Sequence, residues 1–318
     1  MCTAVSYRNN THYFGRTLDY ERSFGEEIVF TPRNCPLPFR ELPDFETHHA
    51  ILGMAHVEEG YPLYYDAMNE KGLCMAGLNF VGFAAYTGQG RDKVAPFEFI
   101  PWVLGQCETV AQVKVLLTHT ALTETDFSQH LPASRLHWLI ADQDEAITVE
   151  SMADGLHIHE NPVGVLTNNP PFPEQMRHLT SFSHLSPQPP VNHFPIDLKP
   201  ISRGMGAMGL PGDLSSPSRF VRVAFTNLHS LCDENQGLSQ FFHIIGSVEQ
   251  VKGCCRLEDG SLEHTIYTSC CDNARRIYYY TTYGNRRICG IDMNREDFDG
   301  NCLQRYPLLT AEDILLQN

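Results

Sequence analysis

The alternation of apolar and polar residues at the start of the chain predicts a β-hairpin. Residues 3–7 and 11–14 place β-branched and aromatic side chains between polar ones, which is the pattern of a half-buried strand. Asn9 and Asn10 lie between the two runs, and asparagine tolerates the positive φ of a two-residue hairpin turn. The second strand should therefore run back toward the N-terminus.

Similar patterns predict further strands and several helices. The run of strands followed by a pair of helices favours an α+β layered fold over a βαβ alternation. The predicted strands are 73–80, 136–141, 146–151, 156–159, 163–167, 265–268, 276–282 and 288–292, and the predicted helices are 97–107, 109–119, 217–231 and 238–248.

The composition is that of one globular domain without a membrane segment. The chain has 318 residues and no evident repeat or long linker, so we expect a single domain over residues 1–318. It lacks a run of eighteen apolar residues, so we expect no membrane span. Its first twenty residues do not resemble a signal peptide.

Charge and cysteine content indicate which partners and which cellular compartment to expect. The net charge of −15 argues against extended contact with nucleic acid, which requires a surplus of lysine and arginine on one face. Eleven cysteines is an odd number in a chain with no secretory signal. We therefore expect a cytoplasmic protein with reduced thiols.

One glycine-rich segment matches a nucleotide-binding pattern without its context. Residues 204–209 read GMGAMG, which fits G-x-G-x-x-G. That fingerprint functions between a strand and the N-terminus of a helix, whereas this segment follows PIDLKPISR and precedes LPGD. We interpret it as a glycine-rich loop.

Candidate metal ligands are also present without a convincing site. The vicinal pairs at 254–255 and 270–271 lack C-x-x-C spacing, and neighbouring residues of a strand point to opposite faces. His157 and His159 would share one face of a strand, but no third ligand is evident nearby. We expect structural cysteines and neither a metal nor a cofactor.

Cys2 differs because its position gives it chemistry. If Met1 is removed, so that the mature chain starts at Cys2, one residue carries both a thiol and a free α-amine. The ordinary pKa values are about 8.5 and about 7.7–8.0, so the amine can act as the base of the thiol. An ordinary buried cysteine after Met1 is the alternative on this fact alone.

Arg16 and Asp19 are candidates for supporting that chemistry. A cation beside the sulfur would stabilise thiolate, and a carboxylate would hold the amine. The simple register pairs Thr3 with Arg16, which would turn Arg16 away from Cys2 unless a bulge near Gly15 reverses its facing. A surface pair of Arg16 and Asp19 stays open as the alternative.

Several segments in order along the chain resemble the choloylglycine hydrolase family, which contains conjugated bile salt hydrolases and penicillin V acylases. The segments are MCTAV, FGRTLDYE, YYDAMNEKGLCMAGLNF, NPVGVLTNNP, SRGMGAMGLPGDLSSPSRFVRVAF, SQFFHIIGSVEQVKG and YTSCCD. The resemblance implies the four-layer αββα sandwich of N-terminal nucleophile hydrolases, cleavage of a linear amide without a cofactor, and a homotetramer.

The resemblance also implies roles for individual residues. Cys2 would attack the amide carbonyl after removal of Met1, with Arg16 beside the thiolate and Asp19 binding the new amine. Two asparagines would hold the oxyanion, and an arginine would complete the polar cluster. These last three are Asn79 of GLNF, Asn168 of LTNNP and Arg219 of SRF.

Asn79 bears on the substrate. Bile salt hydrolases resemble this sequence in having asparagine there, whereas penicillin V acylases more often have tyrosine. The resemblance therefore implies hydrolysis of glycine- or taurine-conjugated bile salts. The segment NFVGFAAYTG is a candidate wall of the steroid pocket, or else it packs against a neighbouring subunit. The alternatives are a penicillin V acylase and a non-enzymatic, thiol-rich binding protein.

Overall fold

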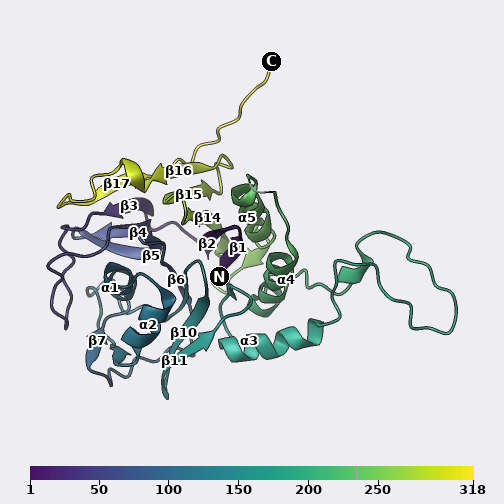
Figure 1. The fold of residues 1–318 in the computed structure, drawn as a ribbon, viewed down its shortest axis with the longest axis horizontal. Helices are drawn as coiled ribbons and strands as arrows, with labels where there is room; N and C mark the ends of the chain where they lie inside the picture. Colours follow the sequence, from purple (N-terminus) through teal and green to yellow (C-terminus); the bar gives the residue numbers. More distant parts are fainter. Residues whose placement is uncertain (234) are drawn as a thin grey trace.

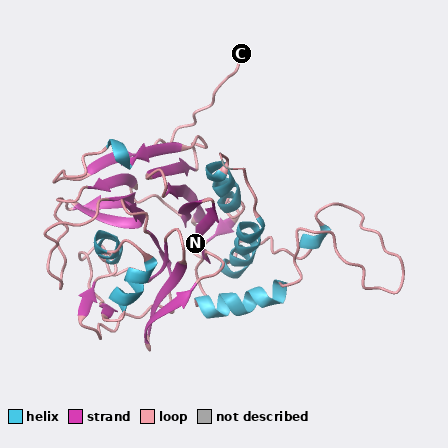
Figure 2. Cartoon of the chain, viewed as in Figure 1, coloured by secondary structure: helices cyan, strands magenta, loops and turns pink. Residues whose placement is uncertain are grey.

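Two large β-sheets pack face to face and carry helices on their outer faces (Figures 1 and 2). The computed structural model describes residues 1–233 and 235–318. One apolar core lies between the sheets and beneath two of the helices, and a second lies between the other sheet face and its helices. This αββα arrangement confirms the predicted α+β fold class.

The first sheet contains the N-terminal hairpin. Within the described residues it has seven strands, all paired antiparallel, in the order β12-β1-β2-β14-β15-β16, with β13 added beside β14. The strands are β1 (Cys2–Asn9), β2 (Thr11–Tyr20), β12 (Val165–Leu166), β13 (Cys255–Arg256), β14 (Leu262–Asp272), β15 (Ile277–Thr282) and β16 (Cys289–Asp292).

The second sheet faces the first and is also antiparallel. Its order is β11-β10-β9-β6-β5-β4-β3-β17, and a short parallel pair, β7 and β8, lies outside it. The strands are β3 (Glu27–Thr31), β4 (Ile51–Glu58), β5 (Tyr61–Asn69), β6 (Cys74–Asn79), β7 (Asp92–Val94), β8 (Thr120–Leu122), β9 (Leu136–Ala141), β10 (Ala146–Met152), β11 (Gly155–Glu160) and β17 (Gln304–Pro307).

The helices cover the outer face of each sheet through their apolar sides. In α2, Val110, Val113 and Leu117 are buried at helical spacing, as the sequence predicts. Helices α1 (Phe99–Gln106) and α2 (Val110–Leu117) lie by the second sheet, and α4 (Ser216–His229) and α5 (Gly237–Gly246) pack on the first, with α3 (Phe172–Leu179) beside α4. Short 3-10 turns are η1 (Thr180–Phe182), η2 (Met205–Ala207) and η3 (Met293–Arg295).

The predicted elements are present, and the omissions have physical reasons. Strand β3 is a short run that is buried throughout, so it lacks the alternation that marks a half-buried strand. Strand β5 contains Pro62, a residue that argues against a strand. Helix α3 has apolar residues at helical spacing, but it begins among the prolines at 170, 171 and 173, which indicate a loop. Strands β4, β7, β8, β13 and β17 also have no counterpart among the predicted elements.

The register of the hairpin differs from the simple prediction by one residue. Asn10 alone forms the turn, with φ of 52°, so Asn9 pairs with Thr11 and Thr3 pairs with Thr17. Arg16 therefore lies opposite Ala4, and paired residues of antiparallel strands point to the same face. Because Cys2 and Ala4 share a face, Arg16 faces the Cys2 side without any bulge.

Gly15 does not form the predicted bulge but allows a close approach of two strands. It pairs regularly with Val5, and the irregularity between β2 and β14 lies at Thr265 and Tyr267. A Cβ atom on Gly15 would lie 2.0 Å from the carbonyl oxygen of Ser269 on β14. Glycine is thus required here because two strands approach closely.

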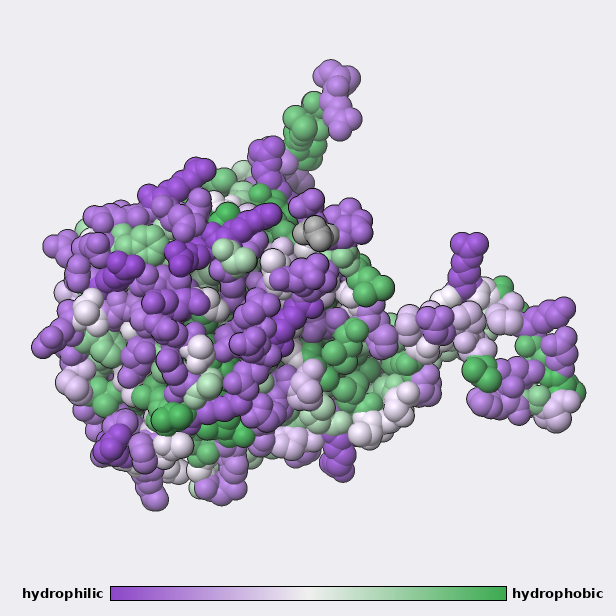
Figure 3. All heavy atoms as spheres, in the orientation of Figure 1, coloured by the Kyte–Doolittle hydropathy of each residue, from purple (hydrophilic) through white to green (hydrophobic). Residues whose placement is uncertain are grey.

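The segment between η1 and α4 extends away from the two sheets (Figure 1). It contains GMGAMG, where Gly204 has φ of +77° and a 3-10 turn follows, which confirms a loop. Figure 3 shows a mostly hydrophilic surface with apolar side chains on this extension; the exposed ones are Val191, Phe194, Ile196, Leu198 and Ile201. None of the described helices is long and apolar enough to cross a membrane.

Candidate active site

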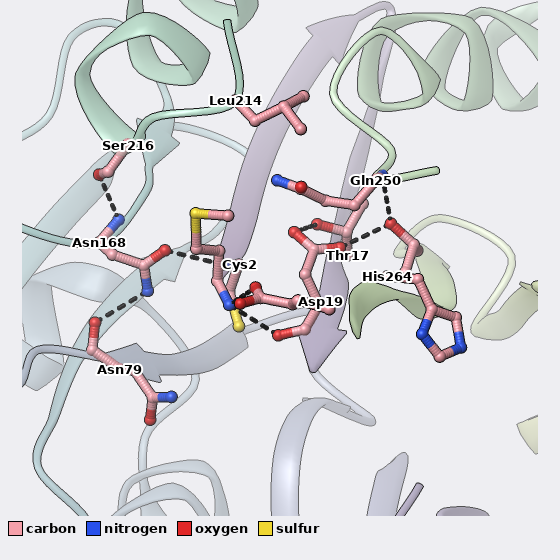
Figure 4. Close-up of polar contacts among 12 residues, drawn as sticks. Cys2, Thr17, Asp19, Asn79, Asn168, Leu214, Ser216, Gln250 and His264 are labelled. Carbon is pink, nitrogen blue, oxygen red and sulfur yellow. Dashed lines mark hydrogen bonds and ion pairs between the residues drawn. The ribbon is translucent and has the colours of Figure 1, made fainter. Parts of the chain in front are cut away.

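Cys2 begins β1 and is buried at 2% exposure. Its backbone nitrogen donates to Asn168 Oδ1 at 2.8 Å, and its carbonyl oxygen accepts from Arg219 Nη1 at 2.5 Å. Figure 4 shows Cys2 between Asn168 on one side and Asp19 on the other. The second residue of the chain is therefore held at the centre of a polar cluster.

Arg219 links three parts of this cluster. It comes from α4 and is fully buried, and its Nη2 donates to Asn168 Oδ1 at 2.8 Å. Its Nη1 also donates to Thr3 Oγ1. Burial lowers the pKa of Arg219, while Asp19 and Cys2 act in the opposite direction. The guanidinium fixes the orientation of the Asn168 amide.

Arg16 is the second buried cation at the site. It is 1% exposed, and it donates through Nε to the Thr17 carbonyl at 3.1 Å and through Nη1 to the Gly77 carbonyl at 2.5 Å. Burial alone would lower the pKa of Arg16, but the negative groups around it, Cys2 foremost, raise it overall. A permanent positive charge thus faces the thiol.

Asp66 supports Arg16 from β5. This buried carboxylate accepts hydrogen bonds from the hydroxyl groups of Tyr267 and Tyr278 at 2.7 and 2.6 Å and from Ser269 at 2.9 Å. Ser269 Oγ in turn accepts from the backbone nitrogen of Arg16 at 3.1 Å. Burial raises the pKa of Asp66, and the charge of Arg16 opposes that shift.

Asp19 lies close to the chain terminus but contacts it through its backbone. Its carboxylate accepts from Thr265 Oγ1 at 2.6 Å and from Thr17 Oγ1 at 3.1 Å. Its carbonyl oxygen accepts from the amine of Met1 at 2.7 Å, and Glu263 forms the ion pair with that amine. Burial raises the pKa of Asp19, while Arg219 and the amine oppose the shift.

The two asparagines contact each other. Asn79 ends β6, and its carbonyl oxygen accepts from Asn168 Nδ2 at 2.9 Å. Asn168 follows β12, and its backbone nitrogen donates to Ser216 Oγ at 2.9 Å (Figure 4). The six residues singled out in the sequence are thereby brought to one place; they are Cys2, Arg16, Asp19, Asn79, Asn168 and Arg219.

Other residues of the cluster were missed by sequence reasoning. Glu263 reaches the terminal amine from β14, and Gln175 of α3 donates to Ser216 Oγ at 3.2 Å. Neither residue has a neighbour in sequence that marks its role. Thr3 and Ser216 lie within the recognised segments MCTAV and DLSSPSRF, so their proximity to Cys2 and Arg219 in sequence could have identified them.

The histidines and cysteines considered above as metal ligands form no metal cluster in the described residues. The rings of His157 and His159 stack with centroids 6.0 Å apart, and their acidic neighbours are Asp154 and Glu150. The part of the chain that the structure describes has no group of three or more side chains suited to hold a metal ion. The cysteines, including those of both vicinal pairs, are free thiols.

Comparison with known proteins identifies the family. A sequence model of the linear amide C-N hydrolases, choloylglycine hydrolase family, matches residues 2–306. The chain belongs to the choloylglycine hydrolase family. It is thus an enzyme of the linear amide C-N hydrolase class, and the cluster around Cys2 is the candidate centre of that chemistry.

Individual choloylglycine hydrolases are similar over the whole chain. The bile salt hydrolase/transferase of Lactiplantibacillus plantarum is 52% identical over 314 residues, covering 97% of each chain. A crystal structure of the conjugated bile acid hydrolase from Clostridium perfringens has a TM-score of 0.93 at 34% identity and 100% coverage of both chains.

A penicillin V acylase shares the same fold. The structure of this enzyme from Agrobacterium tumefaciens has a TM-score of 0.77 at 20% identity, covering 97% of this chain and 92% of the acylase. At this identity the likeness shows the fold alone. It does not decide which amide the protein cleaves.

Proposed function

We propose that this protein is a bile salt hydrolase, which cleaves the amide bond of glycine- or taurine-conjugated bile acids to free bile acid plus the amino acid. The observation that carries the proposal is the position of Cys2, next to Met1 and held by Asn168 and Arg219, in a chain of the amide hydrolase family. The names of the relatives support the substrate class.

Removal of Met1 is the first requirement. It converts the peptide nitrogen of Cys2, which already contacts Asn168 Oδ1 at 2.8 Å, into an α-amine. That amine takes the thiol proton, and the thiolate attacks the amide carbonyl. The amine then gives a proton to the leaving glycine or taurine nitrogen, and water releases the bile acid from the acyl-enzyme.

The surrounding residues have complementary roles in this proposal. Arg16 stabilises the thiolate from the same face of the hairpin, and Asp19 anchors the amine end of the site. The side-chain amides of Asn79 and Asn168 donate to the oxyanion of the tetrahedral intermediate. Arg219 holds Asn168 in place through its 2.8 Å contact. These steps require neither a metal nor an organic cofactor.

The choice of bile salts over penicillin V rests on Asn79 and on the relatives. Comparing kcat/KM for glycocholate, taurocholate and penicillin V tests it. We expect both bile salts to be cleaved faster than penicillin V, and the apolar segment NFVGFAAYTG forms part of the steroid pocket. A rate on penicillin V far above both bile salts would contradict the bile salt assignment and favour the acylase.

Assembly and location are further parts of the proposal. We expect a homotetramer, and the exposed apolar side chains of the extension before α4 are suited to contacts between subunits. Free thiols suit a cytoplasmic enzyme. A single domain over residues 1–318 also stays a prediction. Light scattering after size-exclusion chromatography measures the assembly directly, and a monomer at micromolar concentration would contradict it.

A further inference from the structure

His137 and Glu150 form a buried pair behind the two asparagines. Both side chains are fully buried, on neighbouring strands β9 and β10 that pair residue for residue. His137 Nδ1 lies 3.1 Å from Glu150 Oε1. A buried acid and base of this kind is costly to retain unless its contacts are satisfied, so its partners are informative.

The pair contacts both ends of the segment that contains Asn168. His137 Nε2 lies 2.8 Å from the carbonyl oxygen of Thr167, immediately before Asn168. Glu150 Oε1 accepts from the backbone nitrogen of Phe172 at 2.9 Å, where α3 begins. The segment 167–172 is therefore fixed at its start by His137 and at its end by Glu150.

The same imidazole also contacts the segment that contains Asn79. Its ring stacks on Phe80, with centroids 4.3 Å apart and planes 6° apart. Phe80 is fully buried and directly follows Asn79. In addition, the backbone of His137 pairs with Leu78 and that of Leu136 with Asn79. One side chain thus contacts the neighbours of both asparagines.

Both ring nitrogens of His137 face acceptors. One acceptor is the carbonyl oxygen of Thr167. The other is the carboxylate of Glu150. Burial alone would raise the pKa of Glu150, but His137 and His159 lower this pKa to about 2, so the carboxylate is ionised. Each ring nitrogen of His137 thus has a hydrogen-bond partner, so the orientation of the ring is fixed from both sides. His159 Nε2 lies 3.5 Å from Glu150 Oε2, so a second imidazole faces this carboxylate.

We infer that His137 and Glu150 are positioning residues, which hold the side chains of Asn168 and Asn79 where the oxyanion forms. This inference rests on the proposed roles of Cys2 and the two asparagines, but not on the bile salt as substrate. Neither His137 nor Glu150 touches the reacting atoms. A shift of about 1 Å in a catalytic group can cost on the order of 100-fold in rate.

The test compares His137→Gln and Glu150→Gln with a control, His56→Gln, which alters a half-buried histidine on β4 of the same sheet that contacts Glu58. The substrate is whichever of glycocholate or penicillin V the wild-type protein cleaves faster. We expect His137→Gln to lower kcat about 10- to 100-fold with less than a threefold change in KM, and the control to match wild type.

An aldehyde analogue of the acyl group gives a second measurement. Its thiohemiacetal with Cys2 places an oxygen where the oxyanion forms, whereas the free acid does not. We expect His137→Gln to weaken aldehyde binding by about the factor lost in kcat, while affinity for the acid and the rate of Cys2 alkylation by iodoacetamide stay within twofold. Equal losses for aldehyde and acid would overturn the inference, as would an unchanged kcat.

Glu150→Gln keeps an acceptor for the Phe172 nitrogen, removes the charge and replaces the other oxygen with an NH2 group. It is the variant to use if His137→Gln fails to fold. We expect Glu150→Gln to lower kcat as well. We expect the double variant to lose less kcat than the product of the two single losses. Multiplicative losses would overturn the pair as a unit. Wild-type cleavage of penicillin V in place of glycocholate would overturn the bile salt assignment alone.

Discussion

The side-chain oxygen of Asn168 accepts a hydrogen bond from the backbone nitrogen of Cys2 at 2.8 Å. The same oxygen accepts from Arg219 Nη2. Since Oδ1 is committed to these two donors, Nδ2 of the amide is directed to the side of Asn79, whose carbonyl it reaches at 2.9 Å. The contact thus fixes which end of Asn168 is left to donate to a substrate.

Asn168→Asp separates the two functions of this amide. The variant keeps the oxygen that accepts from Cys2 and Arg219 but loses the Nδ2 donor. Because loss of one oxyanion donor costs about 10²–10³ in kcat, we expect a fall of that size with little change in KM. Steady-state kinetics measure it, and a kcat within threefold of wild type would remove Asn168 from the oxyanion site.

Arg16 provides a test of thiolate stabilisation. In Arg16→Leu the buried cation facing Cys2 is lost, so we expect iodoacetamide to alkylate Cys2 at least about tenfold more slowly at pH 7. Arg16→Lys keeps the charge and should retain a larger part of the rate. A folded Arg16→Leu variant that is alkylated as fast as wild type would contradict this role.

Gly15 tests the close approach of β2 and β14. A Cβ atom there would lie 2.0 Å from the Ser269 carbonyl oxygen, so we expect Gly15→Ala to lower the free energy of unfolding by about 2–4 kcal/mol. Gly212→Ala is the control, because no atom lies within 4 Å of its added Cβ. Denaturant unfolding compares the two, and equal stability would show that the strands separate at little cost.

The pKa of Glu150 predicts a dependence of stability on pH. It is about 2 in the folded protein, below the ordinary value of 4.5, so the unfolded chain binds a proton more readily between these values. The contribution of the ionised carboxylate to the free energy of unfolding is then fully present above about pH 4.5 and is lost as pH falls toward 2. The shift corresponds to roughly 3 kcal/mol.

Unfolding of wild type and Glu150→Gln at several pH values between 6 and 2.5 measures this contribution. We expect the stability difference to be largest at pH 6 and to shrink steadily below pH 4.5. A difference that stays constant across this range would show that the Glu150 carboxylate is not held ionised by His137 and His159.

The sequence predicted the site better than the contacts that support it. Cys2, Arg16 and Asp19 are close along the chain, and Asn79, Asn168 and Arg219 lie in recognisable segments, so each could be named in advance. The facing of Arg16 could not, because it depends on whether one or two residues form the turn at Asn10. A change of one residue in register reverses the facing of a whole strand.

The supporting residues depend on pairings between distant strands. Ser269 meets Arg16 because β14 pairs with β2, and Asp66 comes from the opposite sheet. Glu263 reaches the amine through the same pairing of β14. Local patterns predict that a strand exists but not which strand lies beside it, so these contacts required the structure.

The central claim is that Cys2, freed of Met1, forms the acyl-enzyme. Mass spectrometry of the N-terminal peptide, after rapid acid quenching of the active protein with glycocholate, tests it most directly. We predict a peptide that begins at Cys2 and carries one cholyl group on this residue. Full retention of Met1 in active protein, or the cholyl group on another residue, would contradict the account.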